Sequence, residues 1–288
     1  MKILLTGATG YIGKRLLPVL VSQGHQVICC VRDKDRFDIS GFDSTRVSVV
    51  EVNFLKEDSL KNIPVDIDVA YYLIHSMSAS VGDFEQLEKR SAENFRNRID
   101  RSKARQVIYL SGIINEEKLS KHLSSRKAVE LILAEGKYHL TTLRAGIIVG
   151  SGSASFEIIR DLVEKLPLMV TPRWLNTRAQ PIAIRNVVQF LTGVLLSPPT
   201  FDRSFDIGGP DILTYKEMLL KFSEVRKLHR RIYVIPVMTP RLSSYWLYFV
   251  TSTSYKLAVA LVNSMKIEVV CRDDKLSKIL GIEPIGYE

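Results

Sequence analysis

Apolar and polar positions alternate with two different periods along the first half of the chain. Short apolar runs of the kind that form strands begin near residues 2, 25, 46, 68, 106 and 139, and the segments between them place apolar residues at helical spacing. The run at 68–75 is almost continuously apolar, which is typical of a strand buried on both faces. This strict alternation predicts an α/β fold with a parallel sheet and helices on both of its faces.

The alternation loosens beyond residue 150. Residues 166–182 are rich in Pro, Arg and apolar or aromatic side chains, and they predict a loop region that covers another part of the molecule. A helical pattern at 184–197 and a short apolar run at 205–209 predict a return to the sheet. We therefore expect a larger domain formed by 1–150 with 183–209 returning to it, and a smaller substrate or cap region formed by 151–182 and 210–288.

Composition places the chain among ordinary globular proteins. Of its 288 residues 46% are hydrophobic and 25% are charged, which suits a chain with a substantial core. Its three cysteines, Cys29, Cys30 and Cys271, make neither a disulfide framework nor a metal-binding set, and this scarcity fits a reducing compartment. No long apolar signal segment follows the start, because MKILL runs directly into TGATG. We expect a cytoplasmic location and no metal site.

The formal charge of +9 raises nucleic-acid binding as a hypothesis. Arg98, Arg101 and Arg105 would share one face of a helix, yet Glu93 and Asp100 interleave with them. Mixed charges of this kind are typical of a solvated helix face. Nucleic-acid binding is therefore the less favoured interpretation.

Three glycines mark the turn between the first predicted strand and the first predicted helix. Gly7, Gly10 and Gly13 lie in TGATGYIG, after the strand-like residues 2–6 and at the start of a helical pattern. The first N–H groups of a helix lack internal partners and carry partial positive charge, so they bind phosphate where no side chain intervenes. We expect Gly7 to permit the tight turn, Gly10 to admit a pyrophosphate, and Gly13 to let the helix pack closely on the strand. A tight turn without a ligand is the alternative.

Several motifs together resemble an atypical member of the short-chain dehydrogenase/reductase superfamily. They are TGATGYIG, VRD after the second strand, YLSG at the fifth, LRAGIIVG at the sixth, and DIGGPDILTY. AYYLIHSM, HLSSR, PRW and QPI narrow the similarity to a YbjT-like, NmrA-related set of NAD(P)-binding, nucleoside-diphosphate-sugar-epimerase-like proteins. The resemblance covers nearly the whole chain and implies a Rossmann-type doubly wound sheet with a small C-terminal cap.

The same resemblance assigns residues to a dinucleotide cofactor. It implies a pyrophosphate loop made of Gly7, Thr9, Gly10, Tyr11, Ile12 and Gly13. It places Asn53 and Phe54 beside the adenine, and Leu73, Ile74, His75 and Ser76 beside the inner ribose.

Arg32 follows the second strand, where relatives that prefer NAD carry an acidic residue for the ribose hydroxyls. An arginine at this position implies a preference for NADP(H) over NAD(H), because its forked donors suit a 2′-phosphate. Asp33 follows directly, so a solvent-facing strand end is the alternative.

The catalytic residues of the better-known members are only partly present. Those members use a serine with Tyr-x-x-x-Lys, in which the tyrosine exchanges a proton with the substrate oxygen. Ser111 matches the serine, but the aligned pair here is His122-x-x-x-Arg126, and Lys127 is one position out of place. The resemblance therefore implies Ser111, His122 and Arg126 as catalytic candidates, with Arg126 also binding ribose. Histidine transfers protons near neutral pH, whereas arginine stays charged.

Alternatives stand beside these assignments. His122 would equally serve as a helix-start residue satisfied by the backbone, and Tyr109 and His75 are other candidate proton donors. Tyr109 precedes Ser111 by two residues and so faces the same side of the sheet. Arg173 and Trp174 either line a substrate site or pack within the cap.

The C-terminal region carries a further expectation. GIEPIGYE commonly leads into another C-terminal domain in the resembling set, which implies an additional domain or a protein partner and a chain that is a shortened form. SSYWLYFV would then be an open interface. The longer stretch LSSYWLYFVTSTSY is too short and too rich in Ser and Thr to cross a bilayer, so no transmembrane segment is expected.

Two functions follow from these patterns. The first is an NADP(H)-dependent oxidoreductase or epimerase-like enzyme acting on an unidentified small molecule, which Ser111 and the cap region favour. The second is a non-catalytic module that senses NADP(H) and acts through a protein partner, which the missing Tyr and Lys favour. The glycine turn supports both.

Overall fold

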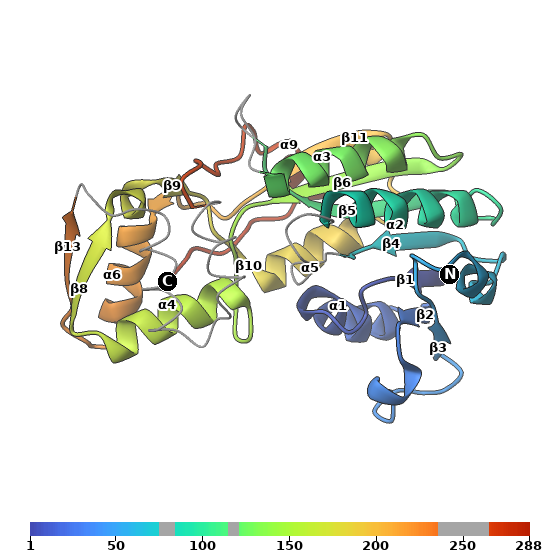
Figure 1. The fold of residues 1–288 in the computed structure, drawn as a ribbon, viewed down its shortest axis with the longest axis horizontal. Helices are drawn as coiled ribbons and strands as arrows, with labels where there is room; N and C mark the ends of the chain where they lie inside the picture. Colours follow the sequence, from blue (N-terminus) through green and yellow to red (C-terminus); the bar gives the residue numbers. More distant parts are fainter. Residues whose placement is uncertain (75–83, 115–120, 236–264) are drawn as a thin grey trace.

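A seven-stranded parallel sheet forms the larger lobe of the protein (Figure 1). The computed structural model describes residues 1–74, 84–114, 121–235 and 265–288. The strands lie in the order β11-β6-β5-β4-β1-β2-β3, with every neighbouring pair parallel. They are β1 (Lys2–Leu5), β2 (Gln26–Val31), β3 (Val47–Glu51), β4 (Val69–Tyr72), β5 (Gln106–Gly112), β6 (His139–Ala145) and β11 (Arg203–Ile207). The predicted Rossmann-type doubly wound sheet is confirmed.

Four helices cover the two faces of this sheet. α1 (Tyr11–Ser22) and α5 (Ile184–Gly193) lie on one face, and α2 (Phe84–Ile99) and α3 (Lys121–Ala134) lie on the other (Figure 1). Successive strand residues point to opposite faces, so Leu5 packs in the core beside α1 while Leu4 packs in the core beside α2. Both faces of the sheet are therefore buried, which explains the continuous apolar runs in its central strands.

A smaller lobe lies at the carboxyl ends of the strands, on the left in Figure 1. It contains α4 (Ala154–Lys165), α6 (Tyr215–Val225) and a parallel strand pair, β8 (Leu168–Pro172) and β13 (Arg231–Ile235) (Figure 1). The prediction that 166–182 is a loop region was wrong, because β8 and the 3-10 helix η3 (Arg173–Asn176) lie within it. The partner of β8 is far away along the chain, so no local pattern signals the pairing. The remaining elements are η1 (Lys34–Arg36), η2 (Glu57–Asn62), β7 (Ile148–Val149), β9 (Arg178–Ala179), β10 (Ile182–Ala183), η4 (Pro198–Thr200), β12 (Leu213–Thr214) and α9 (Lys275–Leu280).

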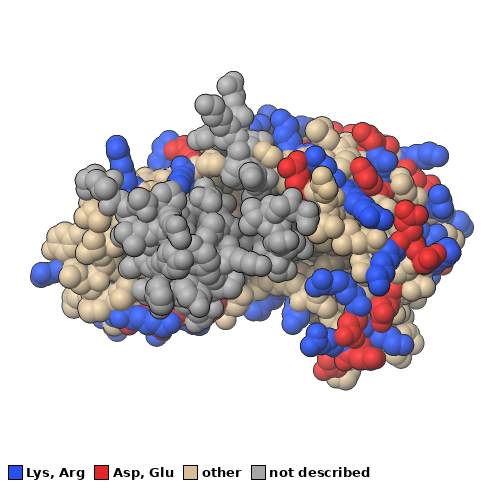
Figure 2. All heavy atoms as spheres, in the orientation of Figure 1, with Lys and Arg blue, Asp and Glu red and all other residues tan. Residues whose placement is uncertain are grey.

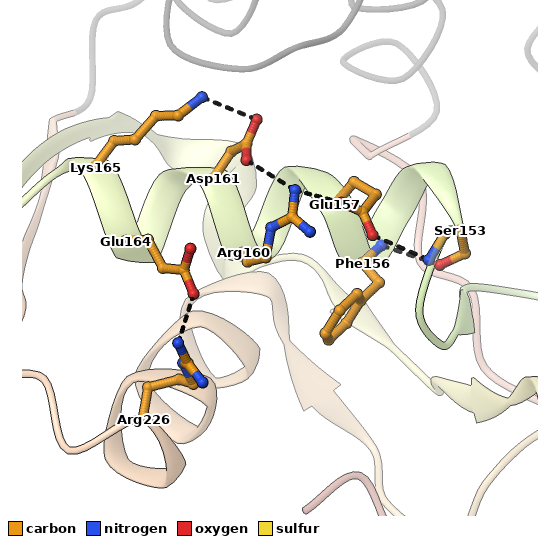
Figure 3. A network of polar contacts seen from close by, with 9 residues as sticks. Ser153, Phe156, Glu157, Arg160, Asp161, Glu164, Lys165 and Arg226 are labelled. Carbon is orange, nitrogen blue, oxygen red and sulfur yellow. Dashed lines mark hydrogen bonds and ion pairs between the residues drawn. The ribbon is translucent and has the colours of Figure 1, made fainter.

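Polar contacts hold α4 in place against α6 (Figure 3). Ser153 caps α4, because its Oγ accepts a hydrogen bond from the Phe156 N–H at 3.2 Å. Glu164 near the end of α4 pairs with Arg226, which follows α6, at 3.0 Å. Asp161 is buried on the same helix and forms ion pairs with two basic residues of α4. These contacts fix the helix whose apolar side faces the interior of the smaller lobe.

The C-terminal part of the chain contacts both lobes. α9 packs against β11, and Leu276 is buried in the core that α1 and α5 share. Part of the segment 210–288 thus contacts the larger lobe, and the domain boundaries stay a prediction. On the face that Figure 2 shows, basic and acidic side chains are interleaved over the larger lobe. Within the described residues, no helix has both the length and the apolar character needed to cross a membrane.

Candidate functional site

The glycine loop between β1 and α1 lies at the carboxyl edge of the sheet, where the strand order reverses. Gly7 has a φ of +67°, and a Cβ at this position would lie 2.6 Å from the Leu73 carbonyl oxygen. A Cβ at Gly13 would lie 2.3 Å from the Gly7 carbonyl oxygen. Gly10 is the N-cap of α1, and no side chain caps this helix start. The loop thus needs glycine and leaves the first N–H groups of α1 clear of side-chain partners, as an anion-binding helix start requires.

Thr6 joins the two strands that flank the crevice. Its hydroxyl donates to the Tyr71 carbonyl oxygen at 2.9 Å and accepts from the Leu73 N–H at 3.0 Å. The side chain is fully buried. These two bonds fix the end of β4 beneath the glycine loop. The sequence analysis missed Thr6, because a threonine at a strand end carries no signal of its own.

A cavity of about 510 Å³ extends from the glycine loop into the smaller lobe. The larger lobe contributes the loop, the ends of β5 and β6, and Arg126 on α3. The smaller lobe contributes side chains of α4, η3 and α6. One continuous, partly open cavity therefore connects a dinucleotide-type loop with an apolar chamber, whose walls are formed by the side chains of α4, η3 and α6.

Ser111 and Arg126, which come from β5 and α3, meet at the wall of this cavity. The Arg126 guanidinium donates to the Leu110 carbonyl oxygen at 3.1 Å. Ser111 is only 3% exposed. Among the described residues, none forms a hydrogen bond of normal distance and angle with its Oγ. Lys127 is exposed. The side chain of His122, the third catalytic candidate, lies outside the described residues.

Tyr109 lies deeper in the same wall. Its hydroxyl donates to the Arg126 carbonyl oxygen at 3.4 Å, and its ring packs edge-on against Tyr72. Burial raises the pKa of Tyr109, and the charge of Arg126 and the nearby Ser111 hydroxyl oppose this rise only in part. The phenol therefore stays protonated at neutral pH.

Within the described part of the chain, three residues of this cavity carry buried polar atoms without a hydrogen-bond partner. The atoms are Tyr11 Oη, Ser111 Oγ and Trp174 Nε1. Buried polar groups in proteins are nearly always paired, because an unpaired one keeps its desolvation cost without compensation. Their clustering around a cavity is what a binding site for a ligand with matching polar groups would produce.

Tyr11 connects the glycine loop to the smaller lobe. A Cβ at Gly150 would lie 2.6 Å from Tyr11 Oη, so only glycine lets the phenol sit there. The Arg15 guanidinium lies 5.7 Å from the centre of the Tyr11 ring and donates to the Ser151 carbonyl oxygen at 3.0 Å. Burial raises the pKa of Tyr11, so this phenol is also neutral.

Comparison with known proteins identifies the cofactor end of this site. Residues 7–148, from the glycine loop to β7, match a family model described as NAD(P)H-binding. Over its full length the chain superposes on a nucleoside-diphosphate-sugar epimerase from Staphylococcus aureus with a TM-score of 0.78, at 14% identity and 98% coverage of that chain. Residues 7–148 form an NAD(P)H-binding domain, and the chain has the fold of the atypical short-chain dehydrogenases/reductases. The resemblance drawn from its motifs is confirmed.

Two further structural neighbours contain a bound cofactor. A triphenylmethane reductase from Citrobacter sp., complexed with NADP(H), has a TM-score of 0.78 and 17% identity, with 98% of this chain and 96% of that chain covered. An NADPH-dependent quinone oxidoreductase from Escherichia coli, complexed with NADPH, has a TM-score of 0.75 and 15% identity, with 99% and 96% covered. At these identities the likeness shows the shared fold alone.

Two curated relatives are plant enzymes. The divinyl chlorophyllide a 8-vinyl-reductase of Cucumis sativus is 25% identical over 229 residues, which are 72% of this chain and 52% of the relative. The enzyme of the same name from Arabidopsis thaliana is 21% identical over 227 residues, 73% of this chain and 54% of the relative. The chain therefore spans about half the length of the curated relatives it matches.

In this NAD(P)H-binding domain, Arg32 lies exposed just after β2. Within the described part of the chain, its guanidinium makes no hydrogen bond or ion pair. Asp33 is engaged elsewhere, because it accepts from the Asp35 N–H at 3.1 Å and pairs with Arg36 at 3.9 Å. Arg32 is therefore a basic group left available directly after this strand.

The two residues expected at the adenine differ in their surroundings. Asn53 is half-buried, and its Oδ1 accepts from the Leu55 N–H at 3.0 Å, which shapes the turn after β3. Phe54 is 7% exposed, and its ring packs 5.8 Å from that of Phe95 on α2. The Phe54 ring thus belongs to the core, which leaves its backbone as the part able to meet an adenine.

The remaining predicted site residues separate into three groups. Leu73 and Trp174 line the cavity, whereas Ile74 packs in the core beside α2 and Arg173 is exposed without lining the cavity. His75 and Ser76 lie outside the described residues, as does the stretch SSYWLYFV at 243–250. The described part of the chain contains no cluster of His, Cys, Asp or Glu suited to a metal ion.

Proposed function

We propose that this protein is an NADP(H)-dependent oxidoreductase that reduces a small molecule in the cavity between its two lobes. The observation that carries this proposal is the continuous cavity that joins the glycine loop, Ser111 and the apolar chamber. A cofactor on the loop and a substrate in the chamber would meet in this cavity. The related vinyl reductase and the neighbouring triphenylmethane reductase and quinone oxidoreductase are consistent with reduction, whereas the Staphylococcus aureus neighbour is an epimerase, so epimerase-like chemistry stays the alternative within the same fold.

Different residues of the chain would hold the cofactor and the substrate. The first N–H groups of α1 would bind the pyrophosphate, and Arg126 would bind the ribose hydroxyls while it holds the end of β5. When bound, NADPH supplies a hydride. Ser111 would donate a hydrogen bond to the substrate oxygen on which negative charge develops, because its hydroxyl is buried at the cavity wall and no described residue bonds it with normal hydrogen-bond geometry.

The proton for that oxygen needs a separate donor. We keep His122 in this role, since histidine is the side chain that changes protonation near neutral pH. A positioned general acid contributes about a hundred- to ten-thousandfold in rate. Replacing His122 with Phe should reduce turnover by that order, and unchanged NADPH oxidation in the variant would remove His122 from the mechanism.

Arg32 supports a preference for NADP(H) over NAD(H). The side chain is exposed, has no partner within the described residues, and follows the strand that ends beside the adenosine site. Its forked donors match a phosphate, which NAD lacks. The neighbouring acid, Asp33, is tied to its own turn and pairs with Arg36 instead.

The proposal is tested in two stages on the purified chain. Fluorescence titration measures the affinities for NADPH and NADH, and initial rates of NADPH oxidation are then followed with a panel of neutral ketones, quinones and conjugated alkenes. Tight NADPH binding with turnover of at least one compound is the expected result. Binding without turnover of any compound would favour a cofactor-sensing module, and absence of NADPH binding would overturn both functions.

A further inference from the structure

We propose that the chamber next to Ser111 selects neutral, largely hydrocarbon substrates that carry an oxygen acceptor for the Trp174 indole N–H in addition to the group that is reduced beside Ser111, and that it rejects nucleotide sugars. This inference rests on the proposed function, because it names the class of substrate that the oxidoreductase would take.

Charge is the first argument. Among the described residues that line the cavity, Arg126 alone has a charged side chain. It lies at the cofactor end, where its guanidinium already donates to the Leu110 carbonyl oxygen at 3.1 Å. A substrate diphosphate placed in the chamber would lose its hydration without gaining a described cation of its own, which is strongly unfavourable. The chamber therefore disfavours nucleoside diphosphates and other multiply charged anions.

The chamber walls supply the second argument. α4 contributes Ile158, Ile159 and Leu162, and α6 contributes Leu219. Trp174 and Tyr215 add two rings that meet edge-to-face at 86°, with their centres 6.2 Å apart. Such walls gain free energy by burying hydrocarbon, and they hold flat molecules well because the rings are themselves fixed by packing.

Trp174 gives the chamber one polar group. The residue is 9% exposed, and its Nε1 has no acceptor among the residues that the structure describes. An indole N–H is a donor only, so a ligand must bring the acceptor to satisfy it. Burial raises the pKa of Tyr215 far above its usual range, so this neighbouring phenol stays neutral and adds no charge. A carbonyl or ether oxygen on an otherwise apolar molecule fits these surroundings.

Four probes test the inference on the full chain saturated with NADP⁺. They are 2-acetylnaphthalene, its near-isostere 2-ethylnaphthalene, the anion 2-naphthoate, and uridine diphosphate, and calorimetry measures each dissociation constant. The ketone should bind most tightly, with the naphthoate at least about tenfold weaker and no uridine diphosphate binding. Trp174→Phe should weaken the ketone about tenfold and leave 2-ethylnaphthalene within about twofold. Leu168→Ala, an exposed change on β8, is the matched control and should alter none of these values.

Opposite results would overturn the inference. They are tighter binding of naphthoate or uridine diphosphate than of the ketone, no ketone binding up to its solubility, or equal losses of ketone and hydrocarbon in Trp174→Phe. The wild-type ranking of the four probes needs no variant, so it decides the charge argument even if Trp174→Phe fails to fold. Ketone binding without any NADPH oxidation would support the chamber assignment while counting against the proposed function, which keeps the two failures distinct.

Discussion

The Arg126 guanidinium donates a hydrogen bond to the Leu110 carbonyl oxygen at 3.1 Å, and this bond fixes a side chain of α3 at the carboxyl end of β5. Leu110 directly precedes Ser111, and all three residues line the cavity. One contact thus links Arg126, which we propose to bind the cofactor, to the strand that carries the buried hydroxyl. A change at Arg126 should therefore affect cofactor binding and the placement of Ser111 together.

We expect Arg126→Ala to weaken NADPH binding about tenfold, because a charge-assisted hydrogen bond to the ribose is lost. Lys127→Ala is the matched control, since Lys127 is the next residue, has a positive charge and is exposed. Its affinity for NADPH should equal that of the wild type. Fluorescence titration measures both variants, and equal losses in the two would mean that general positive charge, rather than the position of Arg126, holds the cofactor.

Arg32→Ala should lower the affinity for NADPH by about ten- to a hundredfold, while the affinity for NADH stays unchanged. The physical reason is the loss of a forked donor pair for the 2′-phosphate, a group that NADH lacks. Arg36→Ala removes the same charge from the same loop and should change neither affinity by more than about twofold. A wild-type protein that binds both cofactors equally would contradict the assignment of Arg32.

Two buried hydroxyls without partners offer a direct test of Ser111. Ser111 lines the cavity, whereas Thr142 is fully buried on the adjacent strand β6 and does not line it. Ser111→Ala should reduce kcat by about a hundredfold or more, because a donor to the developing oxyanion is removed. Thr142→Val should leave kcat unchanged, since the lost hydroxyl had no bond to contribute. Comparable kcat losses in both variants would show that Ser111 acts through packing.

The larger lobe could be predicted from the sequence because its signals are local. β5 was predicted at 106–112 from its apolar run and has those bounds, and the glycine turn follows from residues that are neighbours along the chain. The smaller lobe could not be predicted in the same way. Leu168 on β8 pairs with Arg231 on β13, and a pairing of such distant segments imposes no period on either one. The segment therefore looked like a loop.

Parts of the candidate site could be assigned only from the three-dimensional structure. Arg173 and Trp174 are adjacent in the sequence, yet the first is exposed and the second lines the cavity. Phe54 was expected at the adenine, but its ring packs on Phe95 because the residue follows β3 toward the α2 face. Side-chain direction at a turn depends on backbone angles that residue type alone does not determine. Tyr11, which was assigned to the pyrophosphate loop, is the first residue of α1, and its contact with Gly150 needed the three-dimensional arrangement.

The cysteine thiols should react slowly in the folded protein. Burial raises the pKa of Cys29 to about 12 and that of Cys271 to about 12, so almost no reactive thiolate exists at pH 8. A chromogenic disulfide reagent should label Cys271 first, because it is the more exposed of the two, and should label both rapidly in denaturant. Rapid labelling of Cys29 at pH 8 without denaturant would contradict its burial.

The raised pKa of Cys29 also makes the stability of the fold depend on pH. The folded pKa of Cys29 lies above the ordinary value of 9.0, so its contribution to stability is fully present below pH 9. It is lost as the pH rises from 9 toward 12, because the unfolded thiol ionises first. Thermal unfolding between pH 8 and pH 11 should therefore show a falling Tm, and Cys29→Ala should reduce that slope.

Gly7→Ala tests the loop that anchors the site. Gly7 has a φ of +67°, and an added Cβ would lie 2.6 Å from the Leu73 carbonyl oxygen, so the variant must adopt a rare conformation and push β4 away. We expect the free energy of unfolding to fall by about 2–4 kcal/mol and NADPH binding to be lost.

Gly24→Ala separates the cost of the backbone conformation from the cost of the clash, since Gly24 has a φ of +82° but no atom within 4 Å of its added Cβ. It should cost about 1 kcal/mol, the price of the backbone conformation alone, and leave NADPH affinity unchanged. Gly41→Ala has an open environment and an ordinary φ, so it should be nearly neutral. Denaturant unfolding and NADPH titration of the three variants give the ranking, and a Gly7→Ala protein as stable as Gly24→Ala would show that the loop tolerates a side chain facing β4.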